Sequence, residues 1–362
     1  MPATSAEELA PDFKCEVHCM SLMVQEIHEQ PAALERTLRM EHSTIVRIKK
    51  IAQRRSFRLV YLIARGTSDN AALFGRYLIE ITTKHLTSLA APSVHTLYRA
   101  RLDLRRTLAV GISQSGESAD VNMVLDACRQ QGAFTVGITN HGRSTMAQLV
   151  HEVLLIHTGT ERSVAATKTY TAQMLLLYEL AWALGARFRR REVERLPALA
   201  ATALQLEGRV KAAARRYRTM QHCIVVGRGL NYANSYELAL KLMETCYVVA
   251  ERFSAADLLH GPIALIERGF PVFVFLPPGV TRPGLDKLVR RLKQLGAKIL
   301  LFSNQGRLPP ARTALVLPGR IPELWTPIPY TIPAQLFAAY LAEAKGLNPD
   351  APRHLKKITS TV

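Results

Sequence analysis

The sequence is poor in features that mark several classes of protein. Its five cysteines are an odd number at scattered positions, so they do not form the framework of a disulfide-stabilised miniprotein. Aromatic residues make up 7% of the chain, and they do not alternate with basic residues as in many nucleic-acid-binding surfaces. There is no low-complexity tract, and 48% of the residues are hydrophobic. These absences leave an ordinary globular protein of 362 residues, long enough for two domains.

Long hydrophobic runs are also missing. The most apolar helical stretch, 171–186, is interrupted by Gln173 and Glu179 and is too short to cross a bilayer. We therefore expect a core helix there and no membrane partner. No signal peptide is recognisable, and unpaired cysteines fit a reducing compartment, so the sequence predicts a cytoplasmic protein.

Acidic residues are fewer than basic ones, 29 against 47, which gives a formal net charge of +18. An anionic partner fits this excess. However, the basic clusters at 187–191 and 215–218 fall in expected helices without a recognisable nucleic-acid-binding module, so we interpret them as solvated helix faces and expect no nucleic-acid partner. Cys15, His18 and Cys19 lie close together, but no second cysteine pair completes a tetrahedral site. We expect no metal and no cofactor.

The chain contains an internal repeat. Segments 59–66 and 223–229 are both short apolar runs that end in glycine and precede a helical pattern, and they lie about 160 residues apart. Two further pairs of segments repeat at nearly the same offset, 108–140 with 272–304 and 172–185 with 334–346. Three matches at one offset indicate a duplication.

Each half alternates short β-branched runs with helical stretches, the pattern of parallel strands joined by crossover helices. The predicted fold class is α/β, with two tandem doubly wound parallel-sheet domains of flavodoxin-like type. We expect a helical N-terminal segment at 1–55, a first domain at 56–190, a second at 191–345 and a tail at 346–362, with a linker near 189–197.

Two loops of the first half are rich in hydroxyl groups. Segment 113–118 reads Ser-Gln-Ser-Gly-Glu-Ser after an expected strand, and Gly66, Thr67 and Ser68 follow another. In open α/β sheets, such loops at the carboxyl ends of strands bind ligands, and backbone N–H groups at a helix N-terminus favour an anion. A simple helix cap would use one hydroxyl. We therefore predict a phosphate site without lysine, distinct from the nucleotide-binding glycine motifs. The second half has Leu-Pro-Pro-Gly at 276–279 instead, so we expect one phosphate site.

With the duplication, these loops resemble the sugar isomerase (SIS) domain family, in tandem. The resemblance extends over nearly the whole chain and includes the isomerase half of glucosamine-6-phosphate synthase. It is carried by segments 26–31, 64–68, 113–118, 164–168, 237–244, 259–262 and 348–357. The sequence departs from the synthase at Arg65, where the synthase has cysteine, and at Ala166, where it has serine.

The first sugar-domain strand begins by residue 59 and position 2 is proline, so we expect no glutaminase domain and therefore reaction in the ammonia-releasing direction. Segments 91–94 and 355–357 are similar to SIS-type glucosamine-6-phosphate deaminases. The resemblance implies that glucosamine 6-phosphate and water give fructose 6-phosphate and ammonia. It places phosphate and sugar on Thr67, Ser68, Ser113, Gln114, Ser115, Ser118, Val164 and Ala166.

The same resemblance implies four catalytic residues. Glu244 would move a proton between C2 and C1, a task suited to a carboxylate. Lys241 is three residues earlier and shares its helix face, although that spacing alone also fits a surface ion pair. His260 would open the sugar ring, since an imidazole titrates near neutrality, and would reach a neighbouring subunit's site, which implies a homodimer. Lys357 would cover the open-chain sugar.

Other functions stay open at this stage. The same machinery serves a fructosamine-6-phosphate deglycase, a galactosamine-6-phosphate deaminase or an ammonia-dependent synthase. A noncatalytic sugar-phosphate-binding regulator is a further alternative, although the sequence shows no attached helix-turn-helix module and has Glu244, His260 and Lys357, which a sensor does not require.

Overall fold

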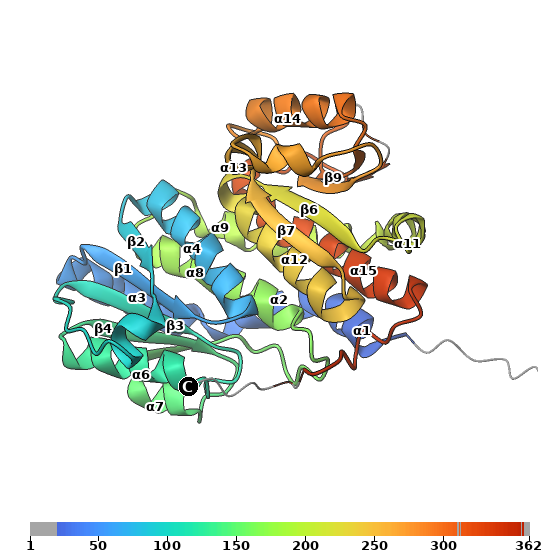
Figure 1. The fold of residues 1–362 in the computed structure, drawn as a ribbon. Helices are drawn as coiled ribbons and strands as arrows, with labels where there is room; N and C mark the ends of the chain where they lie inside the picture. Colours follow the sequence, from blue (N-terminus) through green and yellow to red (C-terminus); the bar gives the residue numbers. More distant parts are fainter. Residues whose placement is uncertain (1–19, 310, 312, 356, 358–362) are drawn as a thin grey trace, which may run out of the picture.

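The computed structural model describes residues 20–309, 311, 313–355 and 357, and it contains two parallel five-stranded sheets (Figure 1). The first sheet has the order β2-β1-β3-β4-β5, with every adjacent pair parallel. Its strands are β1 Leu59–Ala64, β2 Leu86–Leu89, β3 Thr107–Ile112, β4 Phe134–Thr139 and β5 Glu152–Leu155.

The second sheet repeats this topology. Its order is β10-β9-β8-β6-β7, again with parallel neighbours, so the first strand of each half pairs with the second and the third. The strands are β6 His222–Gly227, β7 Val249–Ser254, β8 Pro271–Phe275, β9 Lys298–Ser303 and β10 Thr313–Val316. The predicted tandem doubly wound fold is confirmed.

Helices cover both faces of each sheet, as buried parallel strands require. The first half contains α4 Thr67–Thr83, α5 Pro92–Thr96, α6 Ala119–Gln130, α7 Thr145–Leu149 and α8 Lys168–Ala183. The second half contains α12 Tyr232–Cys246, α13 Ala255–Leu259, α14 Arg282–Gln294 and α15 Pro327–Ala344, with short 3₁₀ turns at Gly229–Asn231, Pro262–Leu265 and Glu323–Trp325. Among the described residues, no helix is long and apolar enough to cross a bilayer.

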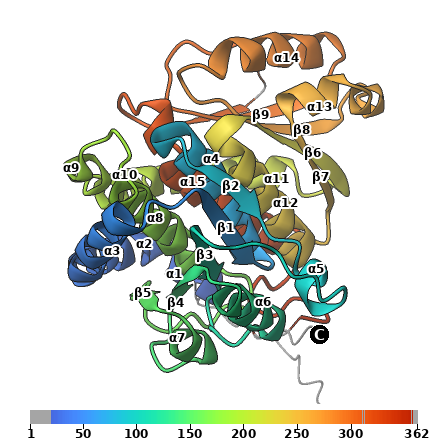
Figure 2. The same ribbon diagram turned by 90° about the vertical axis from the view of Figure 1, so that its left-hand side faces the viewer.

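One hydrophobic core joins the two halves. It includes residues of β1, α4 and α8 from the first half and of α12 and α15 from the second. Helix α4 packs against α12, and α8 contacts α15, so equivalent helices meet across the junction (Figure 2). Smaller separate cores lie under α6 and under α14, on the outer faces of the two sheets. The junction therefore holds α12 of the second half against α4 of the first.

The expected N-terminal helical segment is present as α1 Leu22–His28, α2 Gln30–Met40 and α3 His42–Arg55. Between the halves lie α9 Arg190–Val193, α10 Leu196–Leu204 and α11 Glu207–Arg216. The segment expected to be a linker is thus mostly helical. Arg190, expected on a solvated face, is largely buried, and its Nε lies 2.9 Å from Glu179 Oε2 in the core helix α8.

The described residues of the C-terminal tail follow α15 without helix or strand. The Asp350 carboxylate accepts hydrogen bonds from the backbone N–H groups of Leu22 (2.7 Å) and Met23 (2.8 Å) at the start of α1. Arg353 lies over the ring of Tyr247, with its guanidinium carbon 3.8 Å from the centroid. These contacts lead the tail back to the first half, where Lys357 lies.

Candidate active site

A cavity of about 550 Å³ opens at the carboxyl ends of β1 and β3, the switch point where a doubly wound sheet binds ligands. It is lined from both halves and from the tail. The lining residues are Arg65, Gly66, Thr67, Ser68, Ser113, Gln114, Ser115, Ser118, Glu161, Val164, Ala166, Glu244, Leu355 and Lys357. All eight predicted sugar-phosphate residues, with Glu244 and Lys357, are therefore brought to one cavity.

The loop between β3 and α6 is held rigidly by its own side chains. Ser113 Oγ accepts the Gly116 N–H at 3.1 Å, and Ser115 Oγ accepts the Glu117 N–H at 3.2 Å. Gly116 has φ +69°, and a Cβ there would lie 2.2 Å from Ser144 Oγ, so glycine is required by both conformation and space. The loop leads directly into α6, whose N-terminus favours an anion.

Lys241 lies beneath the cavity rather than on its surface. Its side chain is fully buried, and Nζ lies 2.7 Å from Glu244 Oε2 and 3.1 Å from Thr67 Oγ1. Burial disfavours the ammonium ion, but the carboxylates of Glu237 and Glu244 outweigh this effect and raise the pKa of Lys241. The alternative of an exposed surface ion pair is therefore wrong for this lysine.

Glu237 completes this buried charge cluster at one turn from Lys241. Its carboxylate lies 4.0 Å from Lys241 Nζ and accepts hydrogen bonds from Asn70 (3.1 Å) and Gln335 (3.1 Å). Burial raises the pKa of Glu237, although Lys241 opposes this shift. Asn70 belongs to α4, Gln335 to α15 and Glu237 to α12, so the cluster ties three helices together behind Glu244.

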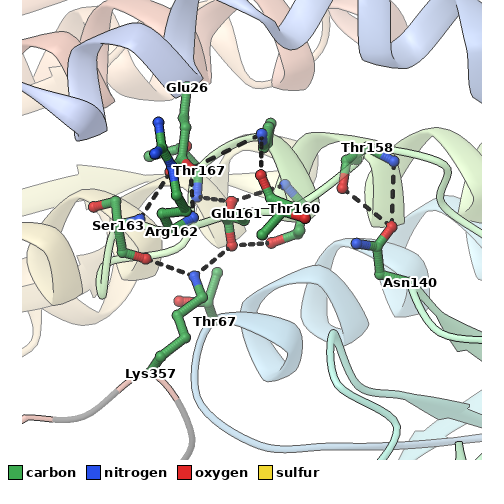
Figure 3. Close-up of polar contacts among 12 residues, drawn as sticks. Glu26, Thr67, Asn140, Thr158, Thr160, Glu161, Arg162, Ser163, Thr167 and Lys357 are labelled. Atoms are coloured by element: carbon green, nitrogen blue, oxygen red, sulfur yellow. Dashed lines mark hydrogen bonds and ion pairs between the residues drawn. The ribbon is translucent and has the colours of Figure 1, made fainter.

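A residue that the sequence did not single out, Glu161, lies at the centre of the loop after β5 (Figure 3). Its buried carboxylate accepts hydrogen bonds from the N–H groups of Thr167 (2.8 Å) and Thr169 (3.2 Å). Lys357 Nζ lies 2.8 Å from Glu161 Oε2 and also donates to the Ser163 carbonyl at 2.6 Å. Although burial raises the pKa of Glu161, Lys357 and the donated hydrogen bonds outweigh it and lower that pKa.

The same loop is fixed from the N-terminal helices. Glu26 Oε1 accepts the Arg162 N–H at 2.5 Å, and Oε2 accepts the Ser163 N–H at 3.2 Å (Figure 3). Burial raises the pKa of Glu26, and these hydrogen bonds oppose the shift. A signal for Glu161 existed in the sequence, since it is the acidic residue in a stretch with threonine or serine at 158, 160, 163, 167 and 169.

His260 is the predicted site residue that lies away from the cavity. It caps the C-terminal end of α13 and is exposed, and it is absent from the cavity lining among the described residues. Exposed Leu259 and Leu265 flank it. The function assigned to it across a subunit boundary stays a prediction.

The equivalent place in the second half is occupied by the chain itself. Thr281 precedes α14 and donates its N–H (3.4 Å) and its hydroxyl (2.5 Å) to the Glu323 carboxylate. A Cβ at Gly279 would lie 2.3 Å from Glu323 Oε2. An internal carboxylate thus stands where the first half has its open hydroxyl loop.

Metal-ligating side chains are dispersed in the part of the chain that the structure describes, which holds no group of three or more His, Cys, Asp or Glu side chains placed to bind a metal ion. Cys128, Cys223 and Cys246 are buried and free. Cys15, His18 and Cys19 lie outside the described residues.

Comparison with known families agrees with this architecture. The family model for the SIS domain matches residues 55–183 and 217–343. The chain belongs to the SIS domain family. Each match of this tandem SIS protein covers one of the two sheets.

Relatives of the SIS protein include isomerizing glutamine-fructose-6-phosphate aminotransferases. The Pyrococcus horikoshii enzyme is 35% identical over 343 residues, and the Symbiobacterium thermophilum enzyme is 37% identical over 359 residues. Each alignment covers 92% of this chain but 57% and 58% of the relative, so the chain spans a little over half the length of these relatives.

Solved structures show the same fold. The C-terminal domain of glucosamine-fructose-6-phosphate aminotransferase from Francisella tularensis superposes with a TM-score of 0.84 at 27% identity, covering 92% of this chain and 99% of that one. Glucosamine-6-phosphate deaminase from Thermotoga maritima gives a TM-score of 0.77 at 24% identity, covering 94% and 100%.

Proposed function

We propose that this SIS protein is an aminosugar-phosphate deaminase that converts glucosamine 6-phosphate and water to fructose 6-phosphate and ammonia. The observation that carries the proposal is the position of Glu244, held by the buried Lys241, in the same cavity as the hydroxyl-rich loop. The aminotransferase relatives are named for chemistry on fructose 6-phosphate, which supports a sugar of this kind.

In this proposal, the phosphate lies on the loop 113–118 and on Thr67 and Ser68. Hydroxyl and backbone N–H donors at the start of α6 hold it without a lysine. The sugar chain then extends past Val164 and Ala166 toward Glu244, with Lys357 above it. No cofactor is needed for these contacts.

Glu244 then transfers the proton. In the open-chain aldehyde, its carboxylate removes the C2 proton, the electron pair of that bond forms a C1–C2 double bond, and the aldehyde oxygen takes a proton from water to give a 2-amino enol. Return of the proton to C1 gives the ketose imine, and water adds at C2 and expels ammonia. Lys241 holds Glu244 Oε2 at 2.7 Å, so the other carboxylate oxygen is available to face both carbons.

The direction follows from mass action. Deamination consumes water, which is always present, whereas the reverse reaction consumes ammonia, which must be supplied. Glucosamine 6-phosphate is therefore the substrate whenever free ammonia is scarce. An ammonia-dependent synthase would use the same residues at high ammonia concentration.

The proposal includes a homodimer in which His260 enters the partner's cavity and assists ring opening. The exposed position of His260, its distance from its own chain's cavity lining and its exposed apolar neighbours favour this arrangement. A histidine is suited to ring opening because it can both donate and accept a proton near pH 7.

The direct test incubates the purified protein with glucosamine 6-phosphate, without glutamine, and quantifies ammonia and fructose 6-phosphate together. Equal amounts of both products support the proposal. Activity on galactosamine 6-phosphate or fructosamine 6-phosphate, but not on glucosamine 6-phosphate, would change the proposed substrate and keep the enzymatic proposal. Binding of all three sugars without turnover would favour a sugar-phosphate-binding regulator and overturn the enzymatic proposal.

A further inference from the structure

Arg65 lies at the end of β1, directly before the loop that carries Thr67 and Ser68. It and Lys357 are the two cationic residues in the lining of the cavity among the described residues. The remaining donors around the loop 113–118 are neutral hydroxyl, amide and backbone groups. Arg65 is thus a half-exposed arginine beside an otherwise neutral set of hydrogen-bond donors.

Asp120 connects Arg65 to the loop that we assign to phosphate. Asp120 is buried in the first turn of α6, and its Oδ2 forms an ion pair with Arg65 Nε. Its other oxygen, Oδ1, accepts hydrogen bonds from Ser118 Oγ at 3.0 Å and from the Val121 N–H at 2.9 Å. One buried carboxylate therefore positions both the Arg65 guanidinium and the Ser118 hydroxyl group.

The ion pair with Asp120 uses Nε, and within the described residues no hydrogen bond engages the two terminal nitrogens of Arg65. Asp69, in the first turn of α4, is a second acidic neighbour that acts on Arg65 electrostatically. Lys357, in contrast, is already bound to Glu161 and the Ser163 carbonyl. Arg65 is thus the cationic lining residue whose terminal nitrogens can still donate hydrogen bonds. A guanidinium holds these donors in a planar arrangement that matches two phosphate oxygens.

We propose that Arg65, held in place by Asp120, is a phosphate-recognition residue that makes this site prefer a doubly charged phosphate monoester over a singly charged ester. The inference rests on the proposed function insofar as the ligand is a sugar phosphate. Neutral hydroxyl donors distinguish these two charge states weakly, whereas a fixed cation strengthens binding of the dianion more.

The competing explanation is structural, because Arg65 also fastens β1 to α6 through Asp120. A structural role predicts that substitution of Arg65 lowers the melting temperature and weakens the binding of every ligand by the same factor. A recognition role predicts a change in the ratio of affinities for two esters that differ in charge. The ratio therefore separates the two explanations.

The test measures calorimetric affinities for glucitol 6-phosphate and glucitol 6-sulfate, two open-chain polyols without a carbonyl group to react. At pH 7.5 the phosphate ester carries nearly two negative charges and the sulfate ester carries one. The variants are R65C, which removes the cation, and R65K, which keeps the charge but removes the paired guanidinium donors. R105C is the matched control, because Arg105 is ion-paired to Asp103 on an exposed surface away from the cavity.

We expect R65C to weaken binding of glucitol 6-phosphate about tenfold and binding of the sulfate ester much less. R65K should be intermediate, and R105C should match the wild type. Equal weakening of both esters, or unchanged binding in R65C and R65K, would overturn the assignment of Arg65 and leave the proposed function intact. Failure of the wild type to bind either ester would overturn the sugar-phosphate site itself and the assignment of Arg65 with it.

Discussion

At the scale of single residues, the proposed function depends on Glu244 and on the buried lysine that contacts it. The Glu244 side chain is 22% exposed and faces the cavity, whereas Lys241 is fully buried between Glu237 and Glu244. Two carboxylates around one ammonium keep Lys241 charged despite its burial. The geometry leaves Glu244 at the boundary between this charge cluster and the cavity.

Replacement of Glu244 tests the proton-transfer step. E244Q keeps the shape of the side chain but removes the base, so we expect kcat to fall by roughly 10²-fold to 10⁴-fold while binding of glucitol 6-phosphate changes little. Steady-state kinetics and calorimetry provide the two measurements. E251Q, which changes an exposed glutamate on β7, is the matched control. Substantial remaining activity in E244Q would exclude Glu244 as the essential base.

Glu161 provides a prediction about pH. Its pKa is lowered in the folded protein, so its stabilising contribution is fully present above the ordinary value of about 4.5 and is lost as the pH falls through the lowered folded value. E161Q should therefore melt at a lower temperature than the wild type at pH 5.5, and this difference should narrow below pH 4.5.

Thermal melts from pH 6 to pH 3.5 measure this difference. E35Q, which removes an exposed carboxylate from α2, should show a small difference without the same narrowing. A gap between wild type and E161Q that stays constant down to pH 3.5 would contradict the lowered pKa.

At the scale of elements, the site depends on loops at the carboxyl ends of parallel strands. The turn 113–118 is closed by Gly116, and the loop 158–167 is fixed by Glu26 from the N-terminal helices and by Glu161 from within. The tail is held by Asp350 at α1 before Lys357 enters the cavity. Segments far apart in sequence therefore share one small volume.

A glycine pair tests the rigidity of the phosphate loop. Gly116 and Gly159 both have φ +69°, but a Cβ at Gly116 would meet Ser144 whereas a Cβ at Gly159 meets nothing within 4 Å. Both alanine variants carry the strain of a left-handed backbone, about 1–2 kcal/mol, and G116A adds the clash. We expect G116A to weaken binding of glucitol 6-phosphate at least tenfold, with a clearly smaller effect in G159A. Calorimetry that finds equal affinities in the two variants would contradict this explanation.

Much at this scale was predictable from the sequence. Strand β1 lies within the predicted apolar run 59–66. The repeat predicted two sheets correctly, because buried parallel strands have a strong local sequence pattern. The hydroxyl-rich loop was also recognisable, because its residues are contiguous. The pairs Glu161–Lys357 and Arg65–Asp120 were not predictable, because they join residues that no local periodicity relates.

At the scale of the whole molecule, the two halves of the duplication contribute different residues to the cavity. The first half retains the hydroxyl-rich loop 113–118, and the second half supplies α12. Lys241 of α12 donates a hydrogen bond to Thr67 of the first half, and Glu244 faces the same cavity as the loop. The second half's own loop is filled by Glu323. One cavity therefore takes its lining residues from both halves.

The proposed dimer predicts complementation between two inactive variants. If His260 acts in the partner's cavity, a mixture of E244Q and H260N chains forms hybrid dimers that contain one site with both residues intact. Co-refolded equal mixtures should recover about a quarter of wild-type activity, because half of the dimers are hybrids with one working site each. Ammonia release measures the recovery. If His260 acts within its own chain, mixing recovers no activity.

In the proposed reaction, Glu244 moves a proton from C2 to C1 of an aminosugar phosphate before ammonia leaves. The most direct measurement follows [2-²H]glucosamine 6-phosphate by NMR during turnover. We expect deuterium to leave C2 and to appear in part at C1 of fructose 6-phosphate, with the remainder in water. An aldose product that keeps deuterium at C2, or no reaction at all, would contradict the proposed reaction.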